Sequence, residues 1–86
     1  MPVISKFYGI VIKMYFLGRE HNPPHVHVIY GEETFSISIN DLQIIGGEKE
    51  PSARTLSMVK EWIMIHKEEL QEMWDSQDIH QLDPLV

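Results

Sequence analysis

Three histidines lie close together in the segment His21-Asn-Pro-Pro-His25-Val-His27. Histidine is the side chain that ordinarily changes its charge near neutral pH, so a pair of histidines can serve as general acid and general base. His25 and His27 are two residues apart on a predicted strand, and side chains at that spacing project from the same face of a sheet. We therefore interpret His25 and His27 as candidate catalytic residues.

Further polar groups are expected on the same face. If the histidine strand pairs with its neighbours, Lys13 and Tyr15 come from the preceding strand, and Ser36 and Ser38 come from the following one. This set suits a metal-independent ribonuclease, which needs a base for the 2′-hydroxyl, an acid for the leaving oxygen and a cation for the phosphorane. We expect Lys13 and Tyr15 to act with the histidines, and Arg19, Ser36 and Ser38 to bind the substrate.

The same cluster permits two other interpretations. His21, His25 and His27 supply three imidazoles, and three histidines with an open fourth position form a known zinc arrangement. In that case the cofactor is zinc or another divalent transition metal, whereas the ribonuclease hypothesis requires no cofactor. Histidines beside prolines can also be structural and anchor a loop by hydrogen bonds to backbone carbonyls. No carboxylate lies inside the cluster, so its spacing does not decide between these alternatives.

The elements that must position these side chains can be predicted from the periodicity of apolar residues. A period of two predicts strands over 8–16, 25–30 and 34–39, with a short fourth strand over 42–45. A helical period predicts one long helix over 52–75. Short connections favour antiparallel neighbours. The predicted fold is therefore α+β: an antiparallel sheet of three to four strands with one long C-terminal helix packed on one face.

Several helical residues receive individual predictions. His66 falls within the apolar side of the helix, which is typical of a buried histidine with satisfied hydrogen bonds. His80 lies in the C-terminal tail, where we expect it to be solvated. Met58 and Ile65 lie at the edge of the apolar side and predict an exposed strip for a protein partner or a second copy.

Length and charge narrow the possible functions. The 86 residues predict a single domain over 1–86. The net charge of −6 divides into +2 over residues 1–30 and −8 over residues 31–86. This division allows RNA to bind a mildly basic histidine face, while the acidic helix suits a basic partner and argues against conventional DNA recognition. The chain has no cysteine, no recognisable signal peptide and no membrane-spanning run, so we expect a cytoplasmic protein without membrane contact.

The sequence also resembles a known bacterial family. Glu20-His21-Asn22-Pro23-Pro24-His25-Val26-His27-Val28, together with Glu61-Trp62, His66-Lys67-Glu68-Glu69-Leu70 and Leu82-Asp83-Pro84-Leu85, is similar to the family catalogued as domain of unknown function 4160. The resemblance implies no established activity. It does imply a genetic arrangement like a toxin–antitoxin module, because members are often encoded beside domain of unknown function 2442.

These observations lead to three hypotheses. The first is a ribonuclease-like toxin that belongs to a toxin–antitoxin-like pair and uses the histidine face. The second is a non-enzymatic module that docks a small cognate protein through the helix edge and the tail, with structural histidines. The third is a metal-binding domain built from His21, His25 and His27.

Overall fold

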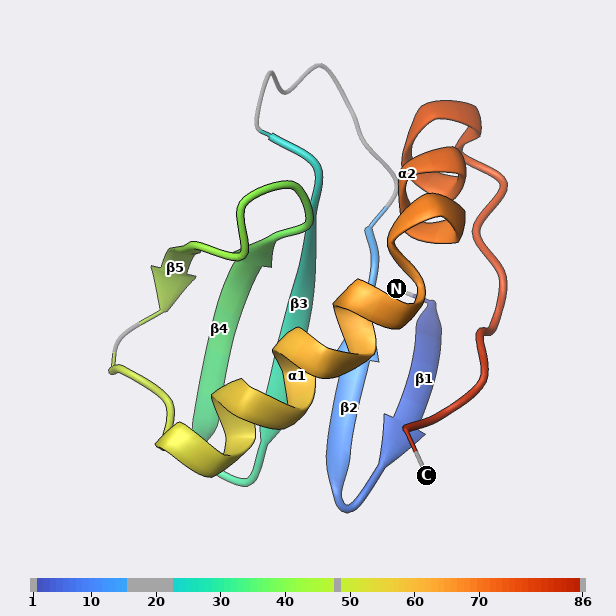
Figure 1. The fold of residues 1–86 in the computed structure, drawn as a ribbon. Helices are drawn as coiled ribbons and strands as arrows, with labels where there is room; N and C mark the ends of the chain where they lie inside the picture. Colours follow the sequence, from blue (N-terminus) through green and yellow to red (C-terminus); the bar gives the residue numbers. More distant parts are fainter. Residues whose placement is uncertain (1, 16–22, 48, 86) are drawn as a thin grey trace.

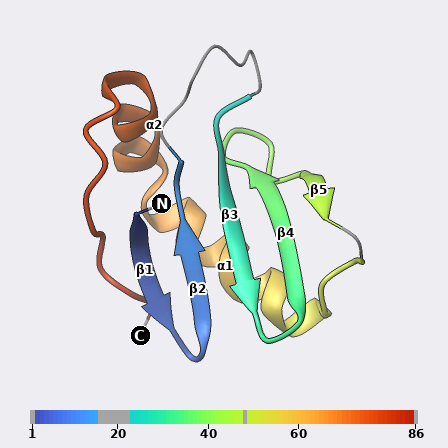
Figure 2. The same cartoon turned by 180° about the vertical axis from the view of Figure 1, so that it is seen from behind.

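The computed structural model describes residues 2–15, 23–47 and 49–85. In this part of the chain, one antiparallel sheet contains the strands in the order β1-β2-β3-β4-β5, so each strand pairs with its sequence neighbour (Figures 1 and 2). The strands are β1 (Val3–Phe7), β2 (Ile10–Lys13), β3 (His25–Tyr30), β4 (Glu33–Ser38) and β5 (Ile44–Gly47). The α+β class and the antiparallel pairing are confirmed, but the sheet has five strands rather than three or four.

The additional strand arises because the predicted strand over 8–16 is interrupted by a turn. Tyr8 and Gly9 have φ values of 51° and 82°, and two consecutive residues with positive φ form the tight turn that suits a hairpin. The chain reverses there, and β1 pairs with β2. Tyr8 lies in this turn and is 59% exposed. The prediction failed because apolar residues continue on both sides of the turn.

Two helices, rather than the predicted single helix over 52–75, follow the sheet. They are α1 (Ala53–Ile65) and α2 (Lys67–Ser76), separated at His66, whose φ of −106° and ψ of 16° leave the helical region. A straight helix over 52–75 would be about 36 Å long, whereas the largest extent of the protein is 31 Å. The break therefore lets α1 cross one face of the sheet while α2 lies beside the strand ends where β2 ends and β3 begins (Figure 1).

The start of α1 is tied to the sheet. The Ser52 hydroxyl accepts a hydrogen bond from the Thr55 N–H at 3.2 Å and so caps the helix. The Glu33 carboxylate of β4 in turn accepts hydrogen bonds from the Ser52 N–H and, at 3.4 Å, from the Thr55 hydroxyl. These contacts fix the side of the sheet on which α1 lies.

The core fills the space between the sheet and the helices. Val26 and Val28 of β3 are fully buried there. The alternate residues of the same strand, His25 and His27, therefore face the opposite side. The principal core side chains are Ile4, Phe7, Ile10, Ile12, Met14, Val26, Val28, Phe35, Ile37, Ile39, Val59, Trp62, Ile63, Leu70, Met73, Trp74 and Leu82.

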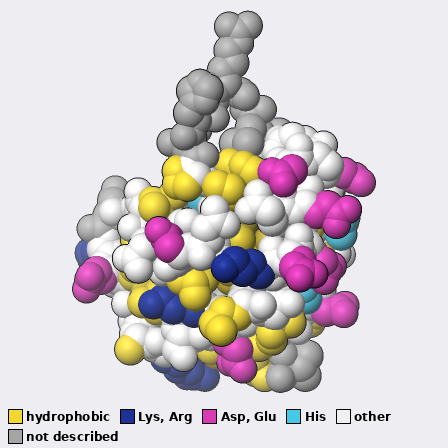
Figure 3. All heavy atoms as spheres, turned by 45° about the horizontal axis from the view of Figure 1, so that its top comes forward, with side chains coloured by type: hydrophobic (Ala, Val, Ile, Leu, Met, Phe, Trp, Pro, Cys, Tyr) yellow, Lys and Arg dark blue, Asp and Glu magenta, His cyan; other side chains and the backbone are white. Residues whose placement is uncertain are grey.

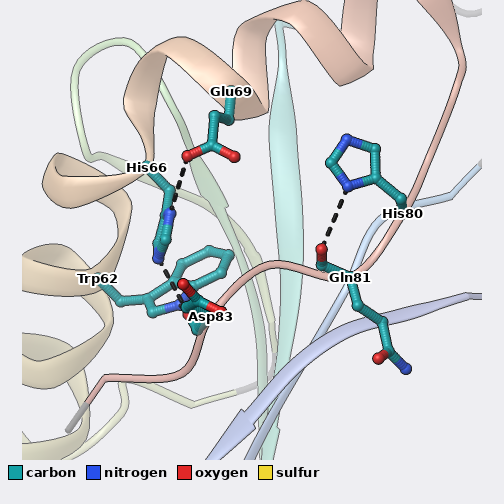
Figure 4. Close-up of polar contacts among 6 residues, drawn as sticks. All are labelled: Trp62, His66, Glu69, His80, Gln81 and Asp83. Atoms are coloured by element: carbon teal, nitrogen blue, oxygen red, sulfur yellow. Dashed lines mark hydrogen bonds and ion pairs between the residues drawn. The ribbon is translucent and has the colours of Figure 1, made fainter.

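The tail over residues 78–85 runs along the outer edge of β1 (Figures 1 and 2). The Leu82 N–H donates to the Ile4 carbonyl at 2.7 Å. The Asp83 carbonyl accepts hydrogen bonds from Trp62 Nε1 and His66 Nε2, both at 2.9 Å (Figure 4). His66 is thus a buried histidine with polar partners, as predicted, and His80 is exposed, as predicted. Neither described helix is long and apolar enough to cross a membrane.

Candidate functional site on the open face of the sheet

The strand register brings Lys13, His27 and Ser36 into one row across the sheet. Lys13 of β2 lies opposite His27 of β3, and His27 lies opposite Ser36 of β4. Residues that are paired across strands point to the same face. This face is the one that neither helix crosses, which we call the open face (Figure 2). Three of the residues selected from the sequence are therefore neighbours on an accessible surface.

On the open face, the His27 side chain contacts Ser36 and Tyr15 in addition to the His25 ring. His27 Nδ1 lies 3.0 Å from the Ser36 hydroxyl, within hydrogen-bonding distance. The Tyr15 ring meets the imidazole edge-on, with the ring centroids 4.0 Å apart and an interplanar angle of 86°. The His27 side chain remains half-buried and so retains solvent access. The ring is held in orientation by Ser36 and Tyr15, as a proton-transferring group requires.

His25 is more enclosed than His27. It is only 8% exposed, and its ring centroid lies 5.0 Å from that of His27 and 5.1 Å from that of Trp74. His25 Nδ1 lies 2.8 Å from the Pro23 carbonyl oxygen, which can only accept, so Nδ1 carries the proton and donates it. In the neutral ring, Nε2 then holds the lone pair. His25 links the open face to α2 and presents a defined tautomer.

The remaining predicted site residues differ in position. Ser38 lies opposite His25 in the register but is almost fully buried, so its hydroxyl is less accessible than that of Ser36. Arg19 and His21, predicted for substrate and metal binding, lie outside the described residues. The described part of the site therefore consists of Lys13, Tyr15, His25, His27 and Ser36.

The strands make the open face cationic. Glu33 is the one acidic residue in the five described strands, and its carboxylate binds Ser52 and Thr55 on the helix-covered side. The same strands carry Lys6 and Lys13 as well as the two histidines. Lys6 pairs with Val11, which pairs with Ile29 of the open face, so both lysines belong to that face. An anion that approaches the open face meets no carboxylate from the described strands.

The described residues do not complete a metal site. Among them, no group of three or more histidine, cysteine, aspartate or glutamate side chains is placed to hold a metal ion. The ring centroids of His25 and His27 are 5.0 Å apart, which is close enough for both imidazoles to bind the same ion. The third residue of the predicted set, His21, is outside the described ranges.

Sequence reasoning did not identify two features of this site. The first is Trp74, a core residue whose indole also packs on His25. That contact depends on the change of direction at His66, for which periodicity carries no signal. Lys6 was missed because β1 was not predicted, although the turn residue Gly9 marks where an additional strand ends.

Comparison with known proteins gives one result. The model of the family described as Domain of unknown function (DUF4160) matches residues 9–75, so the chain belongs to this family. The matched range includes β2 to β5, α1 and most of α2, and thus the histidine cluster with Trp74. No curated protein and no solved structure gives a significant match.

Proposed function

We propose that this member of a family without a described activity is a ribonuclease-like component of a toxin–antitoxin-like pair, and that it binds and cleaves RNA on the open face. The proposal rests on the row formed by Lys13, His27 and Ser36, which places an ammonium, an imidazole and a hydroxyl on adjacent strands. The absence of carboxylates from the described strands of this face favours a polyanionic substrate over a cationic one. We also propose a cytoplasmic location, where cellular RNA is available as a substrate.

His27 is the first proton-transferring group in this proposal. It accepts the proton of the RNA 2′-hydroxyl, and the 2′-oxygen then attacks the adjacent phosphorus. The bond between phosphorus and the 5′-oxygen breaks, and that oxygen takes a proton from the general acid, which leaves a 2′,3′-cyclic phosphate and a 5′-hydroxyl. The Lys13 ammonium offsets the charge that develops on the phosphorane oxygens.

The enclosed His25 is the second imidazole of the mechanism. It lies beside His27 and is the general acid in this proposal. Because the Pro23 contact holds the single proton of the neutral ring on Nδ1, His25 acts as the imidazolium, which gives its Nε2 proton to the 5′-oxygen. Trp74 restricts access to the His25 ring from the side of α2. The substrate must therefore approach His25 Nε2 from the side of Tyr15 and His27. Tyr15 orients His27 and offers its phenol to the substrate.

Cleavage of a structured RNA by the purified protein tests the proposal, with the wild type compared to His27→Ala and Lys13→Gln from pH 5 to pH 8. Loss of a proton-transferring group is expected to reduce the rate about 100-fold or more. Loss of the lysine charge is expected to reduce it about tenfold. Thr34→Ala is the matched control, because Thr34 is an exposed hydroxyl residue of β4 that pairs with Ile29 rather than with a histidine. Intact RNA at every pH, or full activity of His27→Ala, would contradict the proposal.

A metal centre is the second candidate, and one contact favours it. Histidines that bind metals commonly donate their other ring N–H to a backbone carbonyl, as His25 does to Pro23. Zinc or another divalent transition metal would then bind His25 and His27, with His21 as the third ligand. Repeating the cleavage assay with a chelator separates the two candidates, because loss of cleavage on chelation would favour the metal and unchanged cleavage would favour acid–base chemistry alone. Elemental analysis of the purified protein provides the second measurement.

A further inference from the structure

The side of α1 that faces away from the sheet carries a stripe formed by Ala53, Ser57 and Met64, with Ile65 beside it. No described element covers this stripe. Met64 and Ile65 are 67% and 62% exposed, although both are large apolar residues. They lie on a shallow, open surface of α1 that is also lined by Ala53, Leu56, Ser57, Lys60 and Glu61. Figure 3 shows apolar side chains at the surface of the molecule beside both acidic and basic ones. Exposed apolar groups concentrated in one place on a small protein indicate a contact surface.

The stripe has large side chains at one end and small ones at the other. At about 100° per residue, Ala53, Ser57 and Met64 lie along one line on the side of α1 that faces away from the sheet. Met64 is near the C-terminal end of the helix, and Ala53 and Ser57 occupy its N-terminal half. Two copies of α1 in antiparallel orientation therefore place the Met64 side chain of each copy over the small residues of the other. A surface with this property is self-complementary in shape, as a twofold interface requires.

The charges beside the stripe are complementary in the same arrangement. Arg54 and Glu61 are seven residues apart and lie on one flank of the stripe. A twofold axis that relates antiparallel helices brings this flank of one copy against the same flank of the other. Arg54 of each copy then lies beside Glu61 of the second copy, which gives two equivalent ion pairs. Lys60 lies on the other flank, where it faces only its own counterpart.

We propose that the protein forms a twofold-symmetric dimer through α1, with each Met64 side chain packed over Ala53 and Ser57 of the other copy and paired Arg54 and Glu61 side chains at the rim. Antiparallel α1 helices place the two acidic α2 helices at opposite ends of the contact, which limits their repulsion. The α1 helices also lie on the opposite side of the sheet from the open face, so both open faces stay accessible. The inference is independent of the proposed RNA chemistry.

The expected dimer is weak and reversible. A helix of 13 residues is about 20 Å long, so the contact falls at the small end of specific interfaces, near or below about 1,200 Å². The net charge of −6 on each copy further opposes association at low salt. We expect a dissociation constant in the micromolar range, about 10–100 μM, at physiological ionic strength.

Sedimentation equilibrium of the full chain over a concentration series tests the dimer directly. Met64→Asp is expected to raise the dissociation constant about 100-fold or more, because it replaces the large apolar side chain that packs on the small residues of the second copy by a charge. Far-UV circular dichroism and the unfolding midpoint verify that this exposed substitution leaves the fold intact. RNA cleavage by Met64→Asp, if the wild type cleaves, is expected to be unchanged. A wild type that stays monomeric at concentrations well above the expected constant would overturn the proposal and assign the stripe to a different protein.

Charge exchange tests the twofold geometry. Arg54→Glu and Glu61→Arg are each expected to weaken self-association about tenfold, because each replaces two attractive pairs by two repulsive ones. An equimolar mixture of the two variants should form heterodimers at least as tight as the wild-type dimer, since every rim pair is again of opposite charge. Lys60→Ala is the matched control and should leave the dimer equal or tighter. No recovery in the mixture, or a dimer that Lys60→Ala disrupts as strongly as Glu61→Arg does, would overturn the arrangement.

Discussion

The indole of Trp74 lies against the imidazole of His25, with ring centroids 5.1 Å apart and planes inclined by 58°. This contact joins α2 to the start of β3. The His27 ring is next to the His25 ring, and it makes an edge-on contact with the ring of Tyr15. Four rings thus form a continuous series from the helical layer to the open face. The two central histidines are neighbours, but their surroundings give them different roles in stability.

Replacing His25 is expected to destabilise the protein more than replacing His27. His25→Ala removes a ring that packs on Trp74 and a hydrogen bond to the Pro23 carbonyl, which together predict a loss of about 2–3 kcal/mol in the free energy of unfolding. The half-buried His27 has more solvent access, so His27→Ala should cost about 1 kcal/mol. Urea denaturation of the two variants measures both values. An equal or larger loss for His27→Ala would show that the burial difference does not control stability.

Removing the Ser36 hydroxyl is expected to affect activity rather than stability. Ser36→Ala deletes one hydrogen-bond partner of His27 Nδ1, so the imidazole is less well oriented for proton transfer. We expect the rate of RNA cleavage to fall about fivefold to tenfold, which corresponds to one hydrogen bond, with an unfolding free energy within about 1 kcal/mol of the wild type. Cleavage assays and denaturation on the same preparations separate the two effects. Thr34→Ala, on the same strand and face, should change neither, and an equal effect of both variants would argue against a specific role for Ser36.

The hydrogen bonds to the Asp83 carbonyl should make a measurable contribution to stability, because they hold the tail against the helices. Trp62→Phe keeps an aromatic ring in the core but removes the Nε1 donor to that carbonyl, so we expect a loss of about 1–2 kcal/mol. Release of the tail also exposes the Leu82 N–H, which donates to the Ile4 carbonyl. Hydrogen exchange at the Leu82 amide should therefore accelerate in the variant. His80→Ala, which changes an exposed tail residue, should leave both stability and exchange nearly unaltered; similar acceleration in both variants would contradict the role of the Asp83 carbonyl.

Alanine substitutions at two turn glycines should differ in their cost to stability. Gly9 lies between β1 and β2, and Gly31 lies between β3 and β4. Gly9 and Gly31 have φ values of 82° and 58°, so an alanine at either position is strained. At Gly9 the added Cβ would also lie 3.1 Å from Tyr30 Cε1, whereas at Gly31 it would meet no atom within 4 Å. We expect Gly9→Ala to cost about 2 kcal/mol and Gly31→Ala about 1 kcal/mol. Thermal unfolding of both variants gives the comparison, and a smaller loss for Gly9→Ala would mean that Tyr30 moves aside freely.

Some elements could be predicted closely from the sequence for clear physical reasons. β3 has the predicted bounds over 25–30, and β4 differs from the predicted 34–39 by one residue at each end. Both strands alternate in polarity and are separated by a turn at Gly31, so their register and exposed faces follow from the pleat. This local regularity is also why the shared face of His27 and Ser36 could be anticipated.

Other features depend on contacts between distant parts of the chain. The apolar period continues through His66 without a proline or glycine, so nothing local marks the helix break there. In the folded protein, His66 Nε2 donates to the Asp83 carbonyl, a contact across 17 residues. The enclosure of His25 has the same origin, because Trp74 reaches it only after α2 has changed direction. Residue types predicted which groups face outward, but tertiary packing decides how accessible each one is.

The hydrogen bond between Leu82 and Ile4 has a consequence for the order in which the fold is completed during synthesis. β1 leaves the ribosome before the residue that covers its edge, because Leu82 is translated 78 positions after Ile4. Until Leu82 emerges, a nascent chain that has already paired β1 with β2 presents an uncovered edge strand, which is a template for pairing with other chains. Truncations that end before Leu82 should therefore aggregate more readily than the full chain, even where the histidine cluster and both helices are complete.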